Sequence, residues 1–507
     1  MRRSRSQKAL MNTVAGLLNE FVVMLCGLIL PRLILSTFGS SYNGITSSIS
    51  QFISCIALMK SGIGGVTRAA LYKPLAENNI LEISAILYQS EKFLRRVAVL
   101  FIAFVLGFAV IYPIFICTDF DWFFTFSLII IISISTFAQY YFGLTYQLLL
   151  NADQRQCVVS AINIVTTILN TIISAILIKM GFGFHTVKLG SAIIFVLNPL
   201  FISRYTKKYY KLVKNVNNDI DLIKQRWDAM GHEFANFVNS NADVMILTVF
   251  ADIKEVSVYS VYYYVINGIR MVVSNFITGF GAAFGNMYAK EEYDLMQKNM
   301  RIYELIVFSL TTVIYSTTMV MLVPFVMLYT EGINDVAYAR PLFAVIVTIA
   351  GAFTCYRIPY QTVVTAVGHY KQTRNGAIFE AVLHIIISVL GAIRYGLIGV
   401  SLGTAVATIF RSTQYAVYLG QNVLPRNIFH YLGHVFLSLL TIALISYGSN
   451  MFLPDTSTVY MWIVKAIVVT LLSIIATVAE DVLLYRADMV LLLRKVINVF
   501  KRNSRGY

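Results

Sequence analysis

Long hydrophobic runs, each about as long as a lipid bilayer is thick, recur along the chain from Thr13 to Tyr485. A membrane-spanning helix needs about 20 predominantly apolar residues, and polar breaks divide this chain into segments of that length. The runs are continuous rather than alternating, which argues against the strands of a membrane barrel. The pattern predicts an all-α polytopic membrane protein. Its fourteen predicted helices lie at residues 13–36, 43–67, 97–117, 122–148, 158–180, 187–203, 229–250, 256–284, 304–329, 341–366, 376–394, 397–419, 430–449 and 459–485.

Composition and charge agree with this prediction. Hydrophobic residues make up 58% of the chain and charged residues 13%, against about 45–50% and about 25% in soluble domains. Of the 40 Lys and Arg residues, 29 lie in the two terminal segments and in the loops on the same side. The positive-inside rule therefore places both termini in the cytoplasm. Topology explains much of the net charge of +15, so no nucleic-acid partner is expected. The five cysteines lack paired spacing, so they predict neither disulfides nor a metal site.

The chain contains an internal repeat, visible as residue matches at a constant offset. The matched pairs are Gly65 and Gly281, Tyr72 and Tyr288, Tyr140 and Tyr356, and Gln156 and Gln372. Six helices separate the two copies, so the halves share an orientation, as in transporters with parallel repeats. We therefore predict an N-lobe of six helices at 1–203, a basic cytoplasmic linker at 204–228 and a C-lobe of six helices at 229–419. Two further helices and a basic cytoplasmic tail follow at 420–507.

Several short motifs carry a family resemblance. They are LPRL at 30–33, FGS at 38–40, YNGI at 42–45, GIGG at 62–65 and LYKPL at 71–75. This opening is similar to that of the polysaccharide-biosynthesis flippases, which include the O-antigen repeat-unit flippases. Their superfamily also contains the MATE multidrug exporters and the lipid II flippase.

The resemblance implies a function as well as a fold. It implies a transporter of the bacterial cytoplasmic membrane that moves an undecaprenyl-pyrophosphate-linked oligosaccharide from the inner to the outer leaflet by alternating access. The last two helices would form a groove for the lipid tail. The polymerase and other enzymes of an O-antigen or capsule pathway are the expected partners, besides the bilayer itself.

Cations inside the spans are candidates for binding the pyrophosphate, because a charged side chain far from a helix end is costly unless it has a function. Arg270 lies midway along the eighth helix, and Lys60 lies in the second helix, its repeat partner. Arg32 lies near the outer end of the first helix, and Arg357 precedes a proline in the tenth. The alternative for Arg270 and Lys60 is a structural ion pair or a side chain that extends to the membrane interface, and for Arg32 it is such an extension toward the outer interface. Arg357 could instead bond to backbone carbonyls freed by the proline.

Arg411 and Lys465 lie near helix ends, where we expect their side chains to extend toward the membrane interface.

Acidic and amide side chains are candidates for coupling transport to Na⁺ or H⁺. Glu233 and Asn236 share one face of the polar seventh helix. Glu380 and His384, spaced one turn apart in the eleventh helix, could pair with that face as a coupling site, and Glu20 of the first helix could neutralise a cation of the cavity. The alternatives are structural: hydrogen bonds between the lobes for the seventh helix, a bond between Glu380 and His384, and a structural role for Glu20. Asp243, nearer the outer end of the seventh helix, is expected to be solvated.

The motifs for several other functions are absent from the sequence. The chain has no phosphate-binding G-x-x-x-x-G-K-[ST] loop and no H-E-x-x-H metal motif, and we expect neither catalytic residues nor a bound cofactor other than a coupling ion. The main alternative is an ion-coupled drug or cation antiporter of the MATE type, although the charges within the spans lean basic. A membrane-embedded polymerase or ligase would be expected to have a conspicuous polar loop with convergent carboxylates, and a scaffold would not need buried cations.

Overall fold

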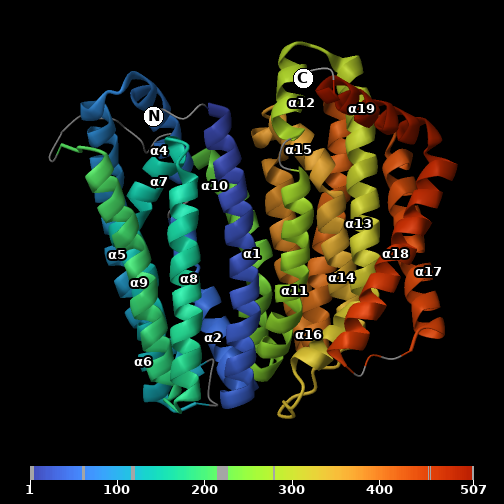
Figure 1. Cartoon of the computed structure of the whole chain (residues 1–507). Helices are drawn as coiled ribbons and strands as arrows, with labels where there is room; N and C mark the ends of the chain where they lie inside the picture. Colours follow the sequence, from blue (N-terminus) through green and yellow to red (C-terminus); the bar gives the residue numbers. More distant parts are fainter. Residues whose placement is uncertain are drawn as a thin grey trace. The chain divides into compact units, whose positions relative to one another are not determined.

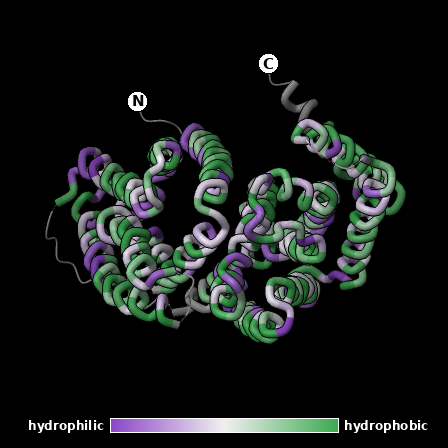
Figure 2. Tube along the Cα trace, turned by 90° about the horizontal axis from the view of Figure 1, so that it is seen from below, coloured by the Kyte–Doolittle hydropathy of each residue, from purple (hydrophilic) through white to green (hydrophobic). Residues whose placement is uncertain are grey.

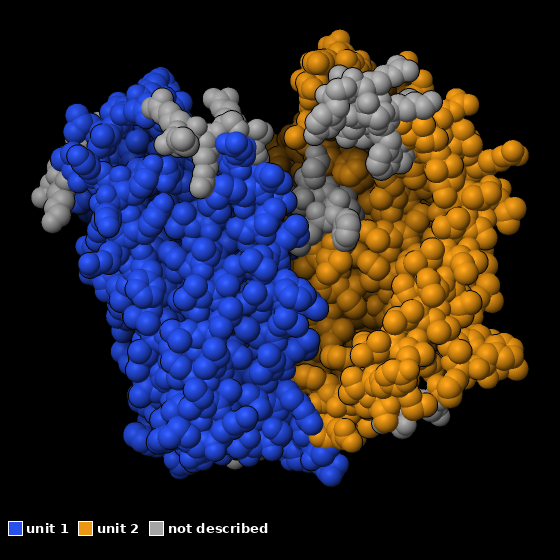
Figure 3. Space-filling model, in the orientation of Figure 1, with its two compact units in different colours: residues 1–257, 332–336 blue, residues 258–331, 337–507 orange. Residues whose placement is uncertain are grey.

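The helices of this chain are grouped into two compact units in a computed structural model. The model describes residues 5–59, 63–115, 120–213, 227–277, 280–454, 456 and 458–504. Unit 1 consists of residues 1–257 and 332–336, and unit 2 of residues 258–331 and 337–507 (Figure 3). All regular secondary structure among the described residues is helical (Figure 1).

Unit 1 is built on the helices of the N-terminal half. Its helices are α1 (Arg5–Phe38), α2 (Ser40–Ile53), α3 (Ile56–Met59), α4 (Ile63–Glu77), α5 (Ile80–Phe115), α6 (Trp122–Ala138), the π-helical turn η1 (Gln139–Gly143), α7 (Leu144–Ala152), α8 (Gln156–Lys179), α9 (Phe184–Tyr209) and α10 (Trp227–Phe250). Helix α1 packs against α8, α8 against α9, and α5 and α9 against α6. Asp121 caps the N-terminus of α6 by accepting a hydrogen bond from the amide of Phe123 at 3.0 Å.

Helix α11 (Ile253–Ile277) begins in unit 1 and continues in unit 2. The other helices of unit 2 are α12 (Phe280–Ala289), α13 (Tyr293–Tyr329), α14 (Pro341–Tyr356), α15 (Ile358–Ala366), α16 (Tyr370–Asn422), α17 (Ile428–Phe452), α18 (Val459–Leu484) and α19 (Arg486–Ser504). The long helix α13 contacts α14, α17 and α18. The buried core of unit 2 includes Met300, Tyr303 and Phe308 of α13 and Tyr356 of α14.

The protein is a multi-pass membrane protein, as the hydropathy pattern predicts. Among the described residues, ten helices are long and apolar enough to span a membrane. Hydrophobic residues follow one another along most helices of both units (Figure 2). Where the structure describes them, the fourteen predicted segments fall mainly on helical residues, but the second, fourth, eighth and tenth are each divided between consecutive helices.

The predicted eleventh and twelfth helices are the two arms of α16, which reverses at Gly396. This residue has φ 52° and ψ −125°, a backbone conformation that glycine adopts most readily. The two arms pack so closely that a Cβ on Gly399 would lie 2.0 Å from the carbonyl oxygen of Gly391. Two facing glycines therefore permit the hairpin.

The internal repeat is visible in the packing within each unit. In unit 1, α4 packs on α7. In unit 2, α12 packs on α15, and these helices cover the matching residues of the second copy. The breaks at η1 and between α14 and α15 fall at matched positions of the two sequence copies.

Two segments differ from simple expectation. Helix α10, the first helix of the predicted C-lobe, contacts α2 and α3 and belongs to unit 1; the division into lobes stays a prediction. The C-terminal segment predicted as a basic tail forms α19, which contacts α13 and α18 and lies across the ends of the unit 2 helices (Figure 1). Its exposed apolar residues Val490, Leu493 and Ile497 recur at helical spacing, as in an amphipathic helix at a membrane surface.

Candidate functional site

Unit 2 contains a buried group of three charged side chains, formed by Glu380, Arg357 and Arg411. Glu380 Oε1 lies 3.0 Å from Nη1 of Arg357, and Oε2 lies 3.3 Å from Nε of Arg411. The side chains of Glu380 and Arg411 are each 3% exposed, and that of Arg357 is 18% exposed. One carboxylate thus holds two guanidinium groups, and the group retains a positive charge.

Local sequence explains where Arg357 lies. It separates α14 from α15, two residues before Pro359, whose missing N–H interrupts the backbone ladder. The amide of Arg357 still donates to the Phe353 carbonyl at 3.1 Å, so the chain continues with little deviation. The guanidinium of Arg357 binds Glu380. The structural alternative from sequence was that it would bind backbone carbonyls freed by Pro359.

Arg411 corrects a sequence-based prediction. Its side chain does not extend to a membrane interface, because it is buried and paired with Glu380. It also donates to the carbonyl of Thr373 at 3.3 Å, to Gln414 at 2.5 Å and to the hydroxyl of Tyr415 at 3.0 Å. Sequence reasoning gave Arg411 no place in a functional site, and the partners of its side chain are not apparent from hydropathy. Lys465, by contrast, donates to the Pro454 carbonyl beyond the start of its helix, at 3.1 Å.

Arg270 of α11 is a second source of positive charge in unit 2. The half-buried side chain donates to Asn267 at 2.7 Å and has no ion pair with any carboxylate in the described part of the chain. The thiol of Cys355 donates to the hydroxyl of Tyr315 at 3.6 Å. A Cβ on Gly351 of α14 would lie 2.7 Å from the Tyr315 ring of α13 and 3.1 Å from Ile266 of α11. Helices α11, α13 and α14 therefore pack closely, one helical turn from Arg270 along α11.

The charge balance of this region is positive. Arg270, Arg357 and Arg411 provide three cations, and Glu380 is the carboxylate that pairs with two of them. A partly dry, cationic environment favours an anionic ligand, and guanidinium groups suit phosphate oxygens in particular.

The other predicted residues are distributed more widely. Lys60 and the side chain of Glu233 lie outside what the structure describes. Asn236 is exposed on α10, while Glu20 and Arg32 are half-buried in α1. These residues keep their predicted roles as hypotheses.

Two details of the proposed coupling residues differ from expectation. The carboxylate of Glu380 binds two arginines of its own unit, and His384 contacts Thr404 at 3.2 Å. A structural role for Glu380, the alternative considered from sequence, accounts for these contacts. Asp243 is 5% exposed, so the expectation that it is solvated is wrong.

A second charged cluster in unit 2 was not predicted from sequence. Glu304 of α13 is 1% exposed and binds Arg426 at 2.5 Å, and it also accepts a hydrogen bond from the hydroxyl of Tyr360. Glu304, His430 and His434 together have the geometry to hold a metal ion. Because Arg426 and Tyr360 already engage the carboxylate, a structural network explains the cluster without a metal. The sequence feature that could have indicated this cluster is the four-residue spacing of His430 and His434, which places both on one face of α17.

Comparison with known proteins finds solved structures with a similar fold. No protein-family model matches the chain, and no curated protein matches it. The chain is similar to the solved structure of the lipid II flippase MurJ in an inward closed conformation, with a TM-score of 0.63 and 15% identity, covering 94% of this chain and 99% of that one.

Two structures of multidrug-resistance MATE transporters of the MOP superfamily are also similar. An inward-facing structure gives a TM-score of 0.58 at 14% identity, covering 80% of this chain and 98% of that one. An outward-facing structure gives 0.57 at 12% identity, covering 87% and 97%. At these identities the similarity shows a shared fold. The chain thus has the polytopic membrane fold of MurJ and the MATE transporters.

Proposed function

We propose that this chain is a flippase that moves an undecaprenyl-pyrophosphate-linked oligosaccharide from the inner to the outer leaflet of the bacterial cytoplasmic membrane. The observation that carries the proposal is the positive charge of the group around Glu380 in unit 2: Arg357 and Arg411 both pair with this one carboxylate, and Arg270 pairs with no carboxylate in the described part of the chain. A lipid pyrophosphate supplies the opposite charge. The similarity to a solved lipid II flippase supports the same substrate class.

The charged residues around Glu380 would have different roles in binding. Arg270 has no carboxylate partner in the described part of the chain, so its guanidinium is free to bind phosphate oxygens. Arg357 is bound to Glu380 and is 18% exposed, so its guanidinium is partly accessible. Glu380 and Arg411 are buried, and they fix the position of Arg357 rather than contact the substrate. Lys60, which lies outside the described residues, stays a predicted substrate-binding residue.

Transport by alternating access requires states open to each side in turn, as in other transporters built from repeats. The solved structures of similar fold include inward-facing and outward-facing conformations. We propose that a Na⁺ or H⁺ gradient or the membrane potential drives the cycle, with Glu233, Asn236 and Glu20 as coupling residues. The termini would face the cytoplasm, where the substrate is assembled, and the polymerase of an O-antigen or capsule pathway would act on the product.

Antiport of drugs or other organic cations is the alternative, favoured by the similarity to MATE structures. A cation substrate would require an acidic cavity to offset its charge. The buried cluster of unit 2 has the opposite sign, so the flippase is the better proposal.

The test is transport in proteoliposomes that contain an undecaprenyl-pyrophosphate-linked sugar. Exposure of the sugar to a membrane-impermeant lectin on the opposite side reports translocation. We expect Arg270→Ala to abolish translocation while membrane abundance stays unchanged, and Arg270→Lys to retain part of it. Arg394→Ala is the matched control, because Arg394 is exposed at the turn of α16. Full activity of Arg270→Ala would refute the role of this residue in binding the pyrophosphate.

A further inference from the structure

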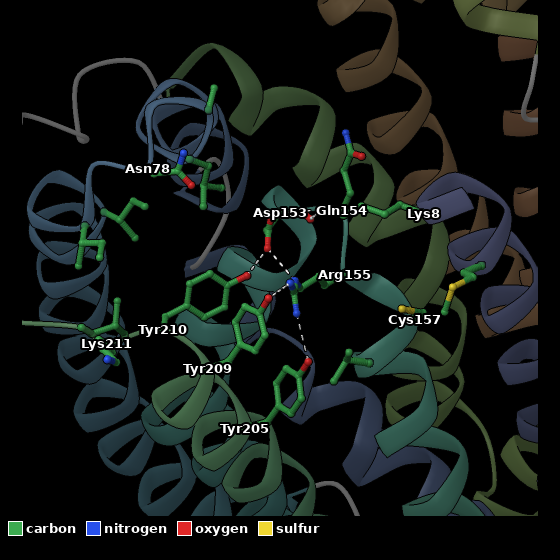
Figure 4. Close-up of a pocket in the computed structure, with 17 residues that line it drawn as sticks. Lys8, Asn78, Asp153, Gln154, Arg155, Cys157, Tyr205, Tyr209, Tyr210 and Lys211 are labelled. Atoms are coloured by element: carbon green, nitrogen blue, oxygen red, sulfur yellow. Dashed lines mark hydrogen bonds and ion pairs between the residues drawn. The ribbon is translucent and has the colours of Figure 1, made fainter. Parts of the chain in front are cut away.

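Unit 1 contains a cavity of about 1070 Å³ that the transport proposal does not use (Figure 4). The start of α1, the turn between α7 and α8 and the end of α9 contribute to its wall, together with the segment that joins α4 to α5. These are the ends of apolar helices long enough to span a membrane. The cavity therefore lies at the level where a lipid headgroup meets water.

Arg155 lines the cavity, and several contacts hold its guanidinium in place. Its Nε lies 2.8 Å from Oδ2 of Asp153, and Nη1 donates to the hydroxyl of Tyr205 at 3.3 Å. Nη2 donates to the hydroxyl of Tyr209, and the guanidinium carbon lies 3.7 Å from the centre of the Tyr209 ring. Figure 4 shows these side chains converging on Arg155. The bonds to Asp153, Tyr205 and Tyr209 use three of the five N–H groups of the guanidinium.

The other partner of Asp153 is Tyr210, whose hydroxyl donates to the carboxylate. Burial, followed by this hydrogen bond, raises the pKa of Tyr210, so the phenol is neutral at physiological pH. The pKa of Arg155 is also raised, because the contacts with the tyrosines and Asp153 outweigh its burial. The wall therefore carries a permanent positive charge that is preorganised before any ligand arrives.

The charge balance of the cavity is positive. Lys8, Arg155 and Lys211 line it, and Asp153 is the acidic residue among the lining residues. The ammonium of Lys8 lies 3.7 Å from the Asp153 carboxylate and 3.4 Å from its carbonyl oxygen, which are long contacts. Lys211 is exposed. Lys8 and Arg155 thus lie on either side of Asp153, whereas Lys211 lines the cavity beyond Tyr210 (Figure 4).

An apolar surface continues from the cavity. Its lining includes Met11, Leu75, Ile80 and Leu212. Met11 is also part of a run of exposed apolar side chains along α1, which includes Leu10, Val14, Leu18 and Phe21. A soluble anion would gain nothing from this surface, whereas the acyl chain of a lipid would bury against it.

We propose that this cavity binds the phosphate headgroup of an anionic membrane lipid, with an acyl chain along α1. Lys8 and Arg155 contact the phosphate, Lys211 adds positive charge at the far side of the cavity, and the tyrosines hold Arg155 in place. Basic pockets between membrane helices are a known means of binding such headgroups. The inference does not depend on the proposed transport substrate, because the cavity and the cationic cluster lie in separate units.

The test is native mass spectrometry of the delipidated full-length protein, titrated with phosphatidylglycerol and with zwitterionic phosphatidylcholine. Each lysine near the anionic headgroup contributes about a factor of five, so Lys8→Gln/Lys211→Gln should weaken phosphatidylglycerol binding roughly 30-fold. Lys73→Gln/Lys208→Gln is the matched control, since both lysines are exposed near the same helix ends and neither lines the cavity. We expect this control to bind like the wild type.

Further titrations identify the source of the headgroup. If undecaprenyl pyrophosphate shows the selective loss and phosphatidylglycerol does not, the cavity binds the polyprenyl lipid; the reverse result identifies a bulk phospholipid. An equal loss in both double variants would overturn the proposal, because it would indicate nonspecific attraction to a basic surface. The absence of any preference for anionic lipid, or binding of inorganic phosphate as tight as that of the lipids, would also overturn it.

Discussion

Glu380→Gln is the substitution that tests the charged group of unit 2 most severely. The change keeps the shape of the side chain but removes the charge that faces Arg357 at 3.0 Å and Arg411 at 3.3 Å. Breaking a buried ion pair costs about 3–5 kcal/mol. We expect about 3 kcal/mol, the lower end, because Arg411 keeps its bonds to Thr373 and Tyr415 and Arg357 is 18% exposed.

The assay is unfolding in mixed micelles on titration with dodecyl sulfate, followed by tryptophan fluorescence. Glu380→Gln/Arg411→Met removes one buried guanidinium together with the carboxylate. Its cost should fall at least about 1 kcal/mol below the sum of the single costs. Glu77→Gln is the control, because Glu77 faces Lys73 at 4.0 Å on the exposed surface and should cost less than about 1 kcal/mol. A cost below about 1 kcal/mol for Glu380→Gln, or strict additivity in the cycle, would refute this description of the group.

Further predictions concern backbone packing and coupling. Gly399→Ala should destabilise the protein by about 1–3 kcal/mol in the same assay, because its Cβ would meet the Gly391 backbone at 2.0 Å. Gly448→Ala is the matched control, with nothing within 4 Å of the added Cβ, and equal costs for the two would contradict the close approach of the α16 arms. Glu233→Gln should remove the dependence of transport on an ion gradient; an unchanged dependence would exclude Glu233 from coupling.

Sequence reasoning predicted the spanning helices well, because each apolar run has to satisfy its own backbone inside lipid. Of the divided helices, it indicated only the tenth, through its proline. The break at Arg357 follows from Pro359, which is visible in the sequence, whereas the π-helical turn at Gln139–Gly143 has no comparable signal. There, Gly143 allows Pro199 of α9 to approach so closely that a Cβ would lie 2.4 Å from the proline Cβ. Tertiary packing, rather than local sequence, explains that break.

The candidate site was predictable only in part. The cations Arg270 and Arg357 were identified because charge is rare inside spans. The pairing of Glu380 with Arg357 and Arg411 was not, since the two arms of α16 and the end of α14 come together only in the folded unit. The cavity around Arg155 was missed for a similar reason. Its residues lie outside the apolar runs and come from separate segments, so no spacing in the sequence connects them.

The central claim is that buried cations bind a lipid pyrophosphate, and the most direct measurement is native mass spectrometry of the purified protein for bound undecaprenyl-pyrophosphate-linked sugars. We predict that such lipids copurify with the wild type and with an Arg394→Ala control, and that they are lost in Lys60→Ala/Arg270→Ala. Binding of organic cations without any polyprenyl lipid would contradict the claim and favour the antiporter.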